Sequence, residues 1–220
     1  MTSPATYFIH ITDTHIKAPT GKPFLNLDTT AKLRSIFAAV RSLSIQPSFF
    51  VISGDLTHEG DVEDYRFLKA LLDEESASFG VPIFVALGNH DHRAPFREGY
   101  LGEAPSEEPY FYVAMVGDAR VIVLNSQIGG GKVEGVIDEV QLEWLRDQLA
   151  TRAPGGTVLV LHHPPTPNTM PLLKDHGLTN PDALAEVIEG SDIVGVLSGH
   201  IHFNSIGVYA GALSVALAGS

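Results

Sequence analysis

The chain has 220 residues, no cysteine and a formal net charge of −12 at pH 7 when its ten histidines are counted as neutral. The acidic balance argues against binding to a nucleic-acid polymer, and the lack of cysteine excludes disulfides and thiolate chemistry and is typical of a reducing compartment. No apolar run reaches the roughly 18–20 residues of a membrane span, and the first apolar run is too short for a signal peptide, so we expect a cytoplasmic protein without a membrane partner.

The first half of the chain alternates between strand and helix patterns. The expected strands are 7–11, 49–53 and 82–87, and the expected helices are 29–43 and 61–79. In the first helix Leu33, Phe37 and Val40 fall on one face, which is the spacing of an amphipathic helix. Asp28 or Thr29 is its expected N-cap, because a side-chain oxygen there can accept from a free backbone N–H.

The second half opens with an irregular segment at 92–109, which prolines and glycines interrupt. Gly117-Asp118 then predicts a hairpin turn, and three glycines at 129–131 predict a loop. The other expected elements are strands at 110–115, 120–125, 157–161, 193–197 and 206–209, helices at 138–149 and 181–188, and a proline-rich loop at 164–171. Residues 210–220 are small and apolar, which fits either a compact chain or one that lacks a C-terminal extension.

This order of elements predicts an α/β fold. Strands that alternate with helices favour α/β layering, and the length favours a single domain over residues 1–220. The hairpin at 110–125 argues against an all-parallel sheet. A mixed sheet, or two sheets packed between helices, fits the pattern best.

Polar clusters follow five of the apolar runs. In an α/β sheet, ligands bind at the loops that follow the carboxyl ends of the strands. The clusters are Asp13-Thr-His15, Gly54-Asp55-Leu-Thr-His58, Gly88-Asn89-His90-Asp91, His162-His163-Pro-Pro and Gly199-His200-Ile-His202. Side chains at i and i+2 of an extended segment point the same way, so two clusters can each offer two ligands to one centre. The donors exceed the roughly four that one zinc-like ion takes, and they suit two ions about 3.5–4 Å apart that share a carboxylate. Imidazoles mixed with carboxylates suit Mn, Fe or Zn.

The five clusters resemble, in order, the blocks of the calcineurin-like metallophosphoesterases. They span residues 13–202, almost the whole chain, and the Gly-Asn-His-Asp and His-His-Pro-Pro wording is similar to the bacterial class III cyclic-nucleotide phosphodiesterases and glycerophosphodiesterases. The resemblance implies a four-layer α/β/β/α sandwich with two mixed β-sheets, and a metal-dependent phosphoric diester hydrolase.

The resemblance also implies a role for each residue. It assigns Asp13, His15 and His202 to the first metal ion, Asn89, His162 and His200 to the second, and Asp55 to both. A hydroxide between the ions would be the nucleophile. His90 would contact the phosphate and assist the leaving oxygen, Asp91 would orient His90, and Asn89, His90 and His202 would contact the substrate.

The expected substrates are small phosphodiesters, with 3′,5′- or 2′,3′-cyclic nucleotides favoured. A phosphomonoesterase or protein phosphatase of the same superfamily fits the same ligand set. A nuclease is disfavoured by the acidic charge, and a non-catalytic scaffold is disfavoured because every ligand and His90 are present. A homodimer is an expected assembly, although related enzymes often build the pocket or dimer from segments after the last histidine block, and almost nothing follows it here.

Several residues have two possible roles. His162 and His163 compete for one ligand place, which the family pattern gives to His162. His58 and His92 line the pocket or lie in solvent. Lys17, Arg93 and Asn204 are candidate substrate contacts, within or near the loops 17–27, 92–109, 126–135 and 164–180 from which specificity is expected.

Overall fold

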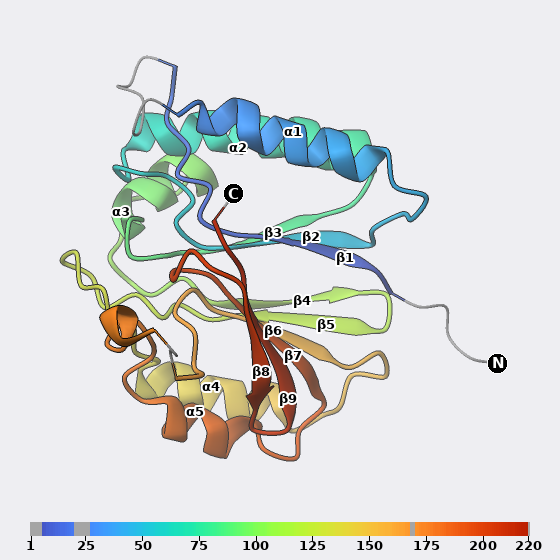
Figure 1. Cartoon of the computed structure of the whole chain (residues 1–220), viewed down its shortest axis with the longest axis vertical. Coiled ribbons are helices and arrows are strands. Elements are labelled where there is room, and N and C mark those ends of the chain that lie inside the picture. Colours follow the sequence, from blue (N-terminus) through green and yellow to red (C-terminus); the bar gives the residue numbers. More distant parts are fainter. Residues whose placement is uncertain (1–5, 20–26, 168–169, 220) are drawn as a thin grey trace.

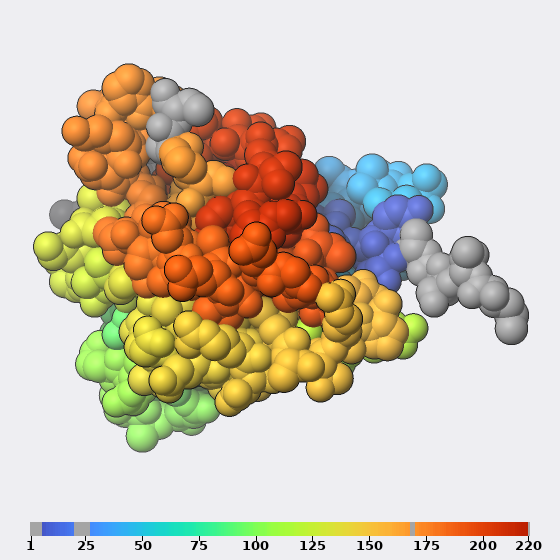
Figure 2. Space-filling model, turned by 90° about the horizontal axis from the view of Figure 1, so that it is seen from below, coloured from blue at the N-terminus to red at the C-terminus, as the bar shows by residue number. Residues whose placement is uncertain are grey.

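The computed structural model describes residues 6–19, 27–167 and 170–219, and these form four layers (Figure 1). Helices α1 (Thr29–Arg41) and α2 (Val62–Phe79) cover a three-stranded sheet, which packs on a six-stranded sheet. Helices α4 (Glu139–Leu149) and α5 (Pro181–Ile188) cover the other face of the larger sheet. Figure 2 looks onto that face, whose surface is formed mainly by the second half of the chain, coloured yellow to red. The α/β/β/α sandwich is confirmed.

The two sheets differ in strand direction. The smaller sheet has the order β1 (Phe8–Ile11), β2 (Phe49–Ser53), β3 (Ile83–Ala86), and its described strands all run parallel. The larger sheet is mixed, with the order β4 (Tyr112–Val116), β5 (Ala119–Val123), β6 (Thr157–Val160), β7 (Ile193–Ser198), β9 (Ala212–Ala216), β8 (Ser205–Tyr209). Its outer pairs β4–β5 and β8–β9 are antiparallel and its inner pairs are parallel.

Three apolar clusters hold the layers together. One lies between α1, α2 and the smaller sheet, one lies between the two sheets, and one lies between the larger sheet and α4 and α5. Every residue of β2 is buried, as the unbroken run of apolar side chains predicts for a central parallel strand. The Asp28 side chain caps α1 by accepting from the Ala31 N–H, which confirms one of the two expected caps.

Two regions differ from the expectation. The segment at 92–109 is not irregular throughout, because it contains α3 (Arg93–Phe96) and a π-helical turn at Arg97–Leu101. Pro95 lies in the first helical turn, where proline is tolerated, and the buried Phe96 anchors the turn by stacking on Tyr100. The apolar tail contains β9, which was not predicted, inserted between β7 and β8. A short 3-10 turn at Pro171–Leu173 begins at the last residue of the expected proline-rich loop.

The layering brings the carboxyl ends of β1, β2, β3, β6 and β7 to one edge of the molecule. Beyond the strands, the loop after β1 stays paired to the loop after β2, through Asp13 N to Gly54 O at 3.0 Å and His15 N to Asp55 O at 2.9 Å. The loop after β7 is tied to the loop after β6, through Gly199 N to His162 O at 2.9 Å. None of the helices in the described ranges is long and apolar enough to cross a membrane.

Candidate metal centre

Five of the seven predicted metal ligands have a left-handed backbone. Their φ angles are 53° at Asp13, 43° at His15, 48° at Asp55, 71° at His200 and 53° at His202. Among the described non-glycine residues only Ala210 shares this property. Such a conformation costs about 1–3 kcal/mol per residue and persists where the surrounding structure holds it, most often at functional sites. The extended geometry expected for these clusters is therefore wrong, and sharp turns aim the side chains instead.

The first ligand group consists of Asp13, His15, Asp55 and His202. Their donor atoms all lie within 4.8 Å of one another. His202 Nε2 lies 3.2 Å from Asp13 Oδ1, and His15 Nε2 lies 3.7 Å from Asp55 Oδ2. The carboxylates are buried, whereas the His202 side chain is 52% exposed. These are the residues that the resemblance assigns to the first metal ion.

The second ligand group lies on the other side of Asp55 and consists of Asn89, His162 and His200. His162 Nε2 lies 3.1 Å from Asn89 Oδ1 and 3.4 Å from Asp55 Oδ1, and the rings of His162 and His200 are 5.0 Å apart. His200 and His202 thus belong to different groups, although their spacing alone had suggested one centre. Asp55 presents Oδ1 to the second group and Oδ2 to the first, which is the placement of a shared carboxylate.

The pKa values of the ligand residues favour the binding of cations. Burial alone would lower the pKa of His162, but the adjacent Asp55 carboxylate raises it to about 9. Burial lowers the pKa of His15 to about 4 and that of His200 to about 3, so both rings are neutral and able to bind a metal at neutral pH. The pKa of Asp13 is lowered, against its burial, by the hydrogen bond to His202.

The donor set fits two metal ions. Two ionised carboxylates are buried side by side, which is costly without positive charge between them. Among the described residues, the buried His200 Nε2 has no hydrogen-bond partner, as expected of an atom reserved for a ligand. Imidazole, amide and carboxylate donors with no thiolate suit Mn, Fe or Zn.

Gly88 makes the close approach of these loops possible. A Cβ atom at this position would lie 2.3 Å from Asp55 Oδ1 and 2.8 Å from His162 Cε1. Any side chain here would therefore push the shared carboxylate away from the second ligand group. The glycine that precedes Asn89 is needed for this contact as well as for the turn.

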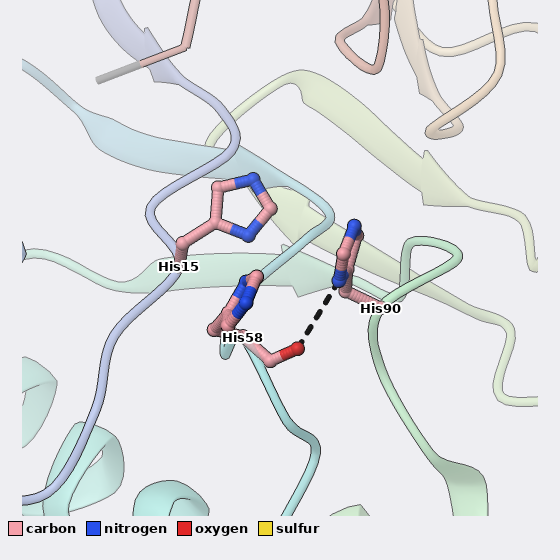
Figure 3. A group of neighbouring side chains, drawn as sticks. All are labelled: His15, His58 and His90. Atoms are coloured by element: carbon pink, nitrogen blue, oxygen red, sulfur yellow. Dashed lines mark hydrogen bonds between the residues drawn. The ribbon is translucent and has the colours of Figure 1, made fainter. Parts of the chain in front are cut away.

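His90 lies beside the ligand groups. Its backbone N–H donates to Asp55 Oδ1 at 2.9 Å, and its ring Nδ1 lies 3.1 Å from the carbonyl oxygen of His58. One nitrogen each of His15, His58 and His90 lie within 4.8 Å of one another, and Figure 3 shows the three rings facing a common space. A carbonyl oxygen can only accept, so Nδ1 carries the hydrogen of the neutral ring and Nε2 is its acceptor nitrogen.

Asp91 does not orient the His90 ring, which corrects the expected role. Its carboxylate is fully buried and accepts from the backbone N–H groups of Gly88, Leu56 and Thr57 at 2.8, 3.1 and 3.2 Å, and from the Tyr65 hydroxyl at 2.9 Å. Burial, followed by the charge of Asp55, raises the pKa of Asp91 to about 6. Asp91 thus ties the loop after β2 to the loop after β3, a contact between distant backbone amides that the sequence pattern does not reveal.

The remaining candidates differ in how close they lie to the ligand groups, and His163 offers a ring nitrogen within 4.8 Å of nitrogens of His162 and His200. His163 is buried, and its Nδ1 lies 2.8 Å from the Ser126 hydroxyl, a partner that the sequence reasoning missed. Arg93 donates to the carbonyl oxygens of Glu107 and Gln127, so its guanidinium is held in the protein. His92 is exposed.

Two more candidates are engaged elsewhere, and part of the specificity loops lies beyond the described ranges. Lys17 Nζ lies 3.3 Å from Glu59 Oε1, and the Asn204 side chain accepts from the Ala218 N–H at 2.9 Å. Residues 20–26 and 168–169 of the expected specificity loops lie outside the described residues.

Comparison with known proteins points to one family. The family model described as calcineurin-like phosphoesterase matches residues 6–204. A probable cyclic nucleotide phosphodiesterase of Rhodococcus erythropolis is 36% identical over 94% of this chain and 68% of its own length. A cAMP/cGMP dual specificity phosphodiesterase of Mycobacterium tuberculosis is 35% identical over 92% of this chain and 64% of its own. The chain thus spans about two thirds of the length of these relatives.

The fold is also found among solved structures. A dimetal phosphatase from Danio rerio superposes with a TM-score of 0.69, over 99% of this chain and 88% of that one, at 16% sequence identity. At that identity the match supports the architecture alone.

Proposed function

The chain belongs to the calcineurin-like phosphoesterases, and we propose that it is a phosphodiesterase that uses two metal ions to hydrolyse small phosphodiesters, with cyclic nucleotides as the favoured class. The observation that carries the proposal is the position of Asp55, whose two carboxylate oxygens face two separate groups of ligands. A carboxylate shared in this way is the signature of a centre for phosphoryl-ester hydrolysis.

In this proposal the chain holds the two ions with the ligand groups already described. Asp13, His15 and His202 hold one, Asn89, His162 and His200 hold the other, and Asp55 contacts both. When bound, such ions supply Lewis acidity toward the phosphate and lower the pKa of water toward neutrality. The donor set accepts Mn, Fe or Zn.

His90 has the task of protonating the leaving oxygen. Its Nδ1 faces the His58 carbonyl oxygen, so its Nε2 is the atom that can reach a substrate. As an oxygen derived from water bonds to phosphorus and the bond between phosphorus and the ribose oxygen breaks, the protonated ring would transfer its Nε2 hydrogen to the ribose oxygen and become neutral. The ring keeps its Nδ1 hydrogen throughout, so it regains the Nε2 hydrogen from water without turning.

The substrate class is inferred from the relatives and from the chemistry of the site. Three relatives are described as cyclic-nucleotide phosphodiesterases, among them the 3′,5′-cyclic adenosine monophosphate phosphodiesterase of Escherichia coli. A cyclic diester has an alkoxide leaving group, which needs a proton, and in this proposal His90 gives it. In this proposal Asn89, which lies beside His162, and His202, which lies beside Asp13, also contact the phosphate.

The test uses protein stripped of metal and reloaded with Mn²⁺. We expect hydrolysis of cyclic AMP and of bis(p-nitrophenyl) phosphate, and none by the stripped protein. The exposed residue His92, which has no assigned role, provides the control variant His92→Ala with unchanged rates. Failure of the reloaded protein to cleave either diester would contradict the proposal, and faster cleavage of p-nitrophenyl phosphate than of either diester would make it a phosphomonoesterase instead.

A further inference from the structure

The loop after β2 brings a second histidine, His58, against His90. Figure 3 shows the His58 ring below and beside His90, with the dashed contact running from His90 Nδ1 to the carbonyl oxygen of His58 itself. One residue therefore touches His90 with both its backbone and its ring. None of the ligand groups described above includes His58.

The carbonyl oxygen of His58 sets the tautomer of His90. The distance from Nδ1 to this oxygen is 3.1 Å, within the range of a hydrogen bond. Because the oxygen has no hydrogen to donate, the contact is satisfied only when Nδ1 is protonated. Every protonation state of His90 that keeps this bond therefore leaves Nε2 as the atom that exchanges a proton.

The ring of His58 sets the plane of His90. The two rings are nearly parallel, with centroids 5.1 Å apart and an angle of 23°. The ring of His15 packs against the ring of His90 in a T-shaped arrangement, with centroids 4.9 Å apart and an angle of 89° between the ring planes. His90 is therefore confined by two rings in different orientations. The torsion that turns a histidine ring is broad and weakly restricted by rotamer preference, so packing is needed to fix it.

The loop that carries His58 is held in place independently of either ring. Asp91 accepts from the N–H groups of Leu56 and Thr57, immediately before His58, and from that of Gly88, two residues before His90. After His58 the chain passes close to the loop after β3, which carries His90. A Cβ atom at Gly60 would lie 3.1 Å from the His90 carbonyl oxygen. The backbone of His58 is therefore fixed relative to His90, and the His58 ring is an addition to that frame.

We propose that His58 is a positioning residue for His90. Its carbonyl oxygen keeps the proton on Nδ1, and its ring holds the imidazole plane so that Nε2 points at the leaving oxygen. The kinetic consequence rests on the proposed function, in which His90 protonates that oxygen, whereas the tautomer and the packing do not.

The direct test is an NMR measurement on isotope-labelled protein loaded with Zn²⁺, which is diamagnetic. At about pH 8 an ordinary imidazole is neutral, and the ring signals of His90, assigned by their loss in His90→Ala, should show hydrogen on Nδ1. In His58→Ala the carbonyl oxygen remains, so the tautomer persists, but we expect the Nδ1 hydrogen to exchange with water about tenfold faster as the ring loses its packing. His58→Phe keeps a flat ring and should restore slow exchange. Hydrogen on Nε2 in the unaltered protein would overturn the proposal, whatever the activity.

The kinetic test compares two leaving groups in the Mn²⁺-loaded enzyme. In His58→Ala, kcat for cyclic AMP should fall about tenfold with KM nearly unchanged, because only an alkoxide depends on the proton from His90. The rate on bis(p-nitrophenyl) phosphate, whose leaving group departs without a proton, should stay within about twofold. His58→Phe should recover most of the loss, and His92→Ala is the matched control on the neighbouring loop. Equal losses on both substrates, or no recovery with phenylalanine, would contradict the positioning role.

These results separate the two proposals. An enzyme that cleaves neither diester but shows the expected His90 tautomer and exchange rates keeps the structural role of His58 and refutes the proposed function. If His58→Ala does not fold, the tautomer in the unaltered protein and the behaviour of His58→Phe still decide the question.

Discussion

The two ligand groups on either side of Asp55 are built very differently. In the second group His162 is fully buried, with Nδ1 2.8 Å from the Ser53 carbonyl oxygen and Nε2 facing Asn89 and Asp55. In the first group His202 is 52% exposed, and its ring contacts Asp13 from a loop outside the sheet. One half of the centre is therefore fixed by the fold, whereas the other half is completed by an exposed side chain.

This difference follows from where the residues lie in the sheet. His162 follows β6, an inner strand of the larger sheet, and His200 follows the adjacent strand β7. His202 comes two residues later, where the chain has left the sheet on its way to the edge strand β8. Rigid strands pre-organise a ligand more precisely than loops do, so we expect the second group to retain its ion more tightly.

The largest effect is expected where the two halves meet. Asp55→Ala removes the carboxylate that faces both groups, so at least one ion should be lost and activity should fall to background. Bound metal is measured by elemental analysis after dialysis. Asp118→Ala, on the exposed turn of the β4–β5 hairpin, is the control. Two retained ions in Asp55→Ala would show that the halves do not share this residue.

The next effect separates chemistry from metal binding. His90→Ala should keep two ions and lower the rate on cyclic AMP by about 10²–10⁴, the usual contribution of a general acid. Elemental analysis and kcat on the same preparation provide the check. Loss of an ion from this variant would mean that His90 belongs to one of the ligand groups.

The two ligand groups should also differ in how much they contribute to the free energy of unfolding. His162→Ala leaves a cavity and an unsatisfied Ser53 carbonyl oxygen, so the metal-free protein should lose about 2–4 kcal/mol of unfolding free energy. His202→Ala removes an exposed ring, and its cost should stay within about 0.5–1 kcal/mol. Urea denaturation of both variants tests the contrast, and equal losses would contradict it.

The metal-free protein should also show a dependence of stability on pH. Asp55, against the effect of burial, raises the pKa of His162 to about 9 in the folded protein, from an ordinary value of 6.5. A group whose pKa is raised by folding stabilises below its unfolded pKa and loses that contribution as pH rises through the folded value. The metal-free protein should thus become less stable between pH 6.5 and about 9.

Bound metal should remove this dependence, because metal ligands are deprotonated already. His15 and His200, whose pKa burial lowers to about 4 and about 3, stay neutral in the folded protein, and they add little to the slope above about pH 7.5, where an unfolded imidazole is neutral as well. Denaturation midpoints measured across the range, with and without Mn²⁺, provide the check. A slope that persists unchanged in the metal-loaded protein would place its origin outside the ligand groups.

Much of the architecture was predictable because the strands are buried on both faces. The run is apolar from Phe49 to Ile52, and the structure makes Phe49–Ser53 the central strand β2. Strand β9 was missed because three of the five residues of Ala212–Ala216 are alanine or serine, which have little strand preference, and pairing with β7 and β8 decides its conformation. The helical turns at Arg93–Leu101 were missed because proline and glycine interrupt the pattern.

The site was predictable at the level of residue type and order, and less so at the level of contact. The strand-end clusters identified the candidate ligands that the fold brings together, but the left-handed turns at Asp13 and Asp55 are imposed by backbone pairing between loops, which no local pattern records. The role of Asp91 was wrong for the same reason, since its partners are backbone amides more than thirty residues away. The contact between His58 and His90 likewise exists only after the loops are joined.

The most direct test of a centre with two unequal halves is a titration of stripped protein with Mn²⁺, in which bound ions and hydrolysis of cyclic AMP are measured together. We expect the first equivalent to bind the second ligand group without activity, and hydrolysis to rise only with the second, weaker equivalent. Full activity with one bound ion, or none with two, would contradict a shared two-metal centre.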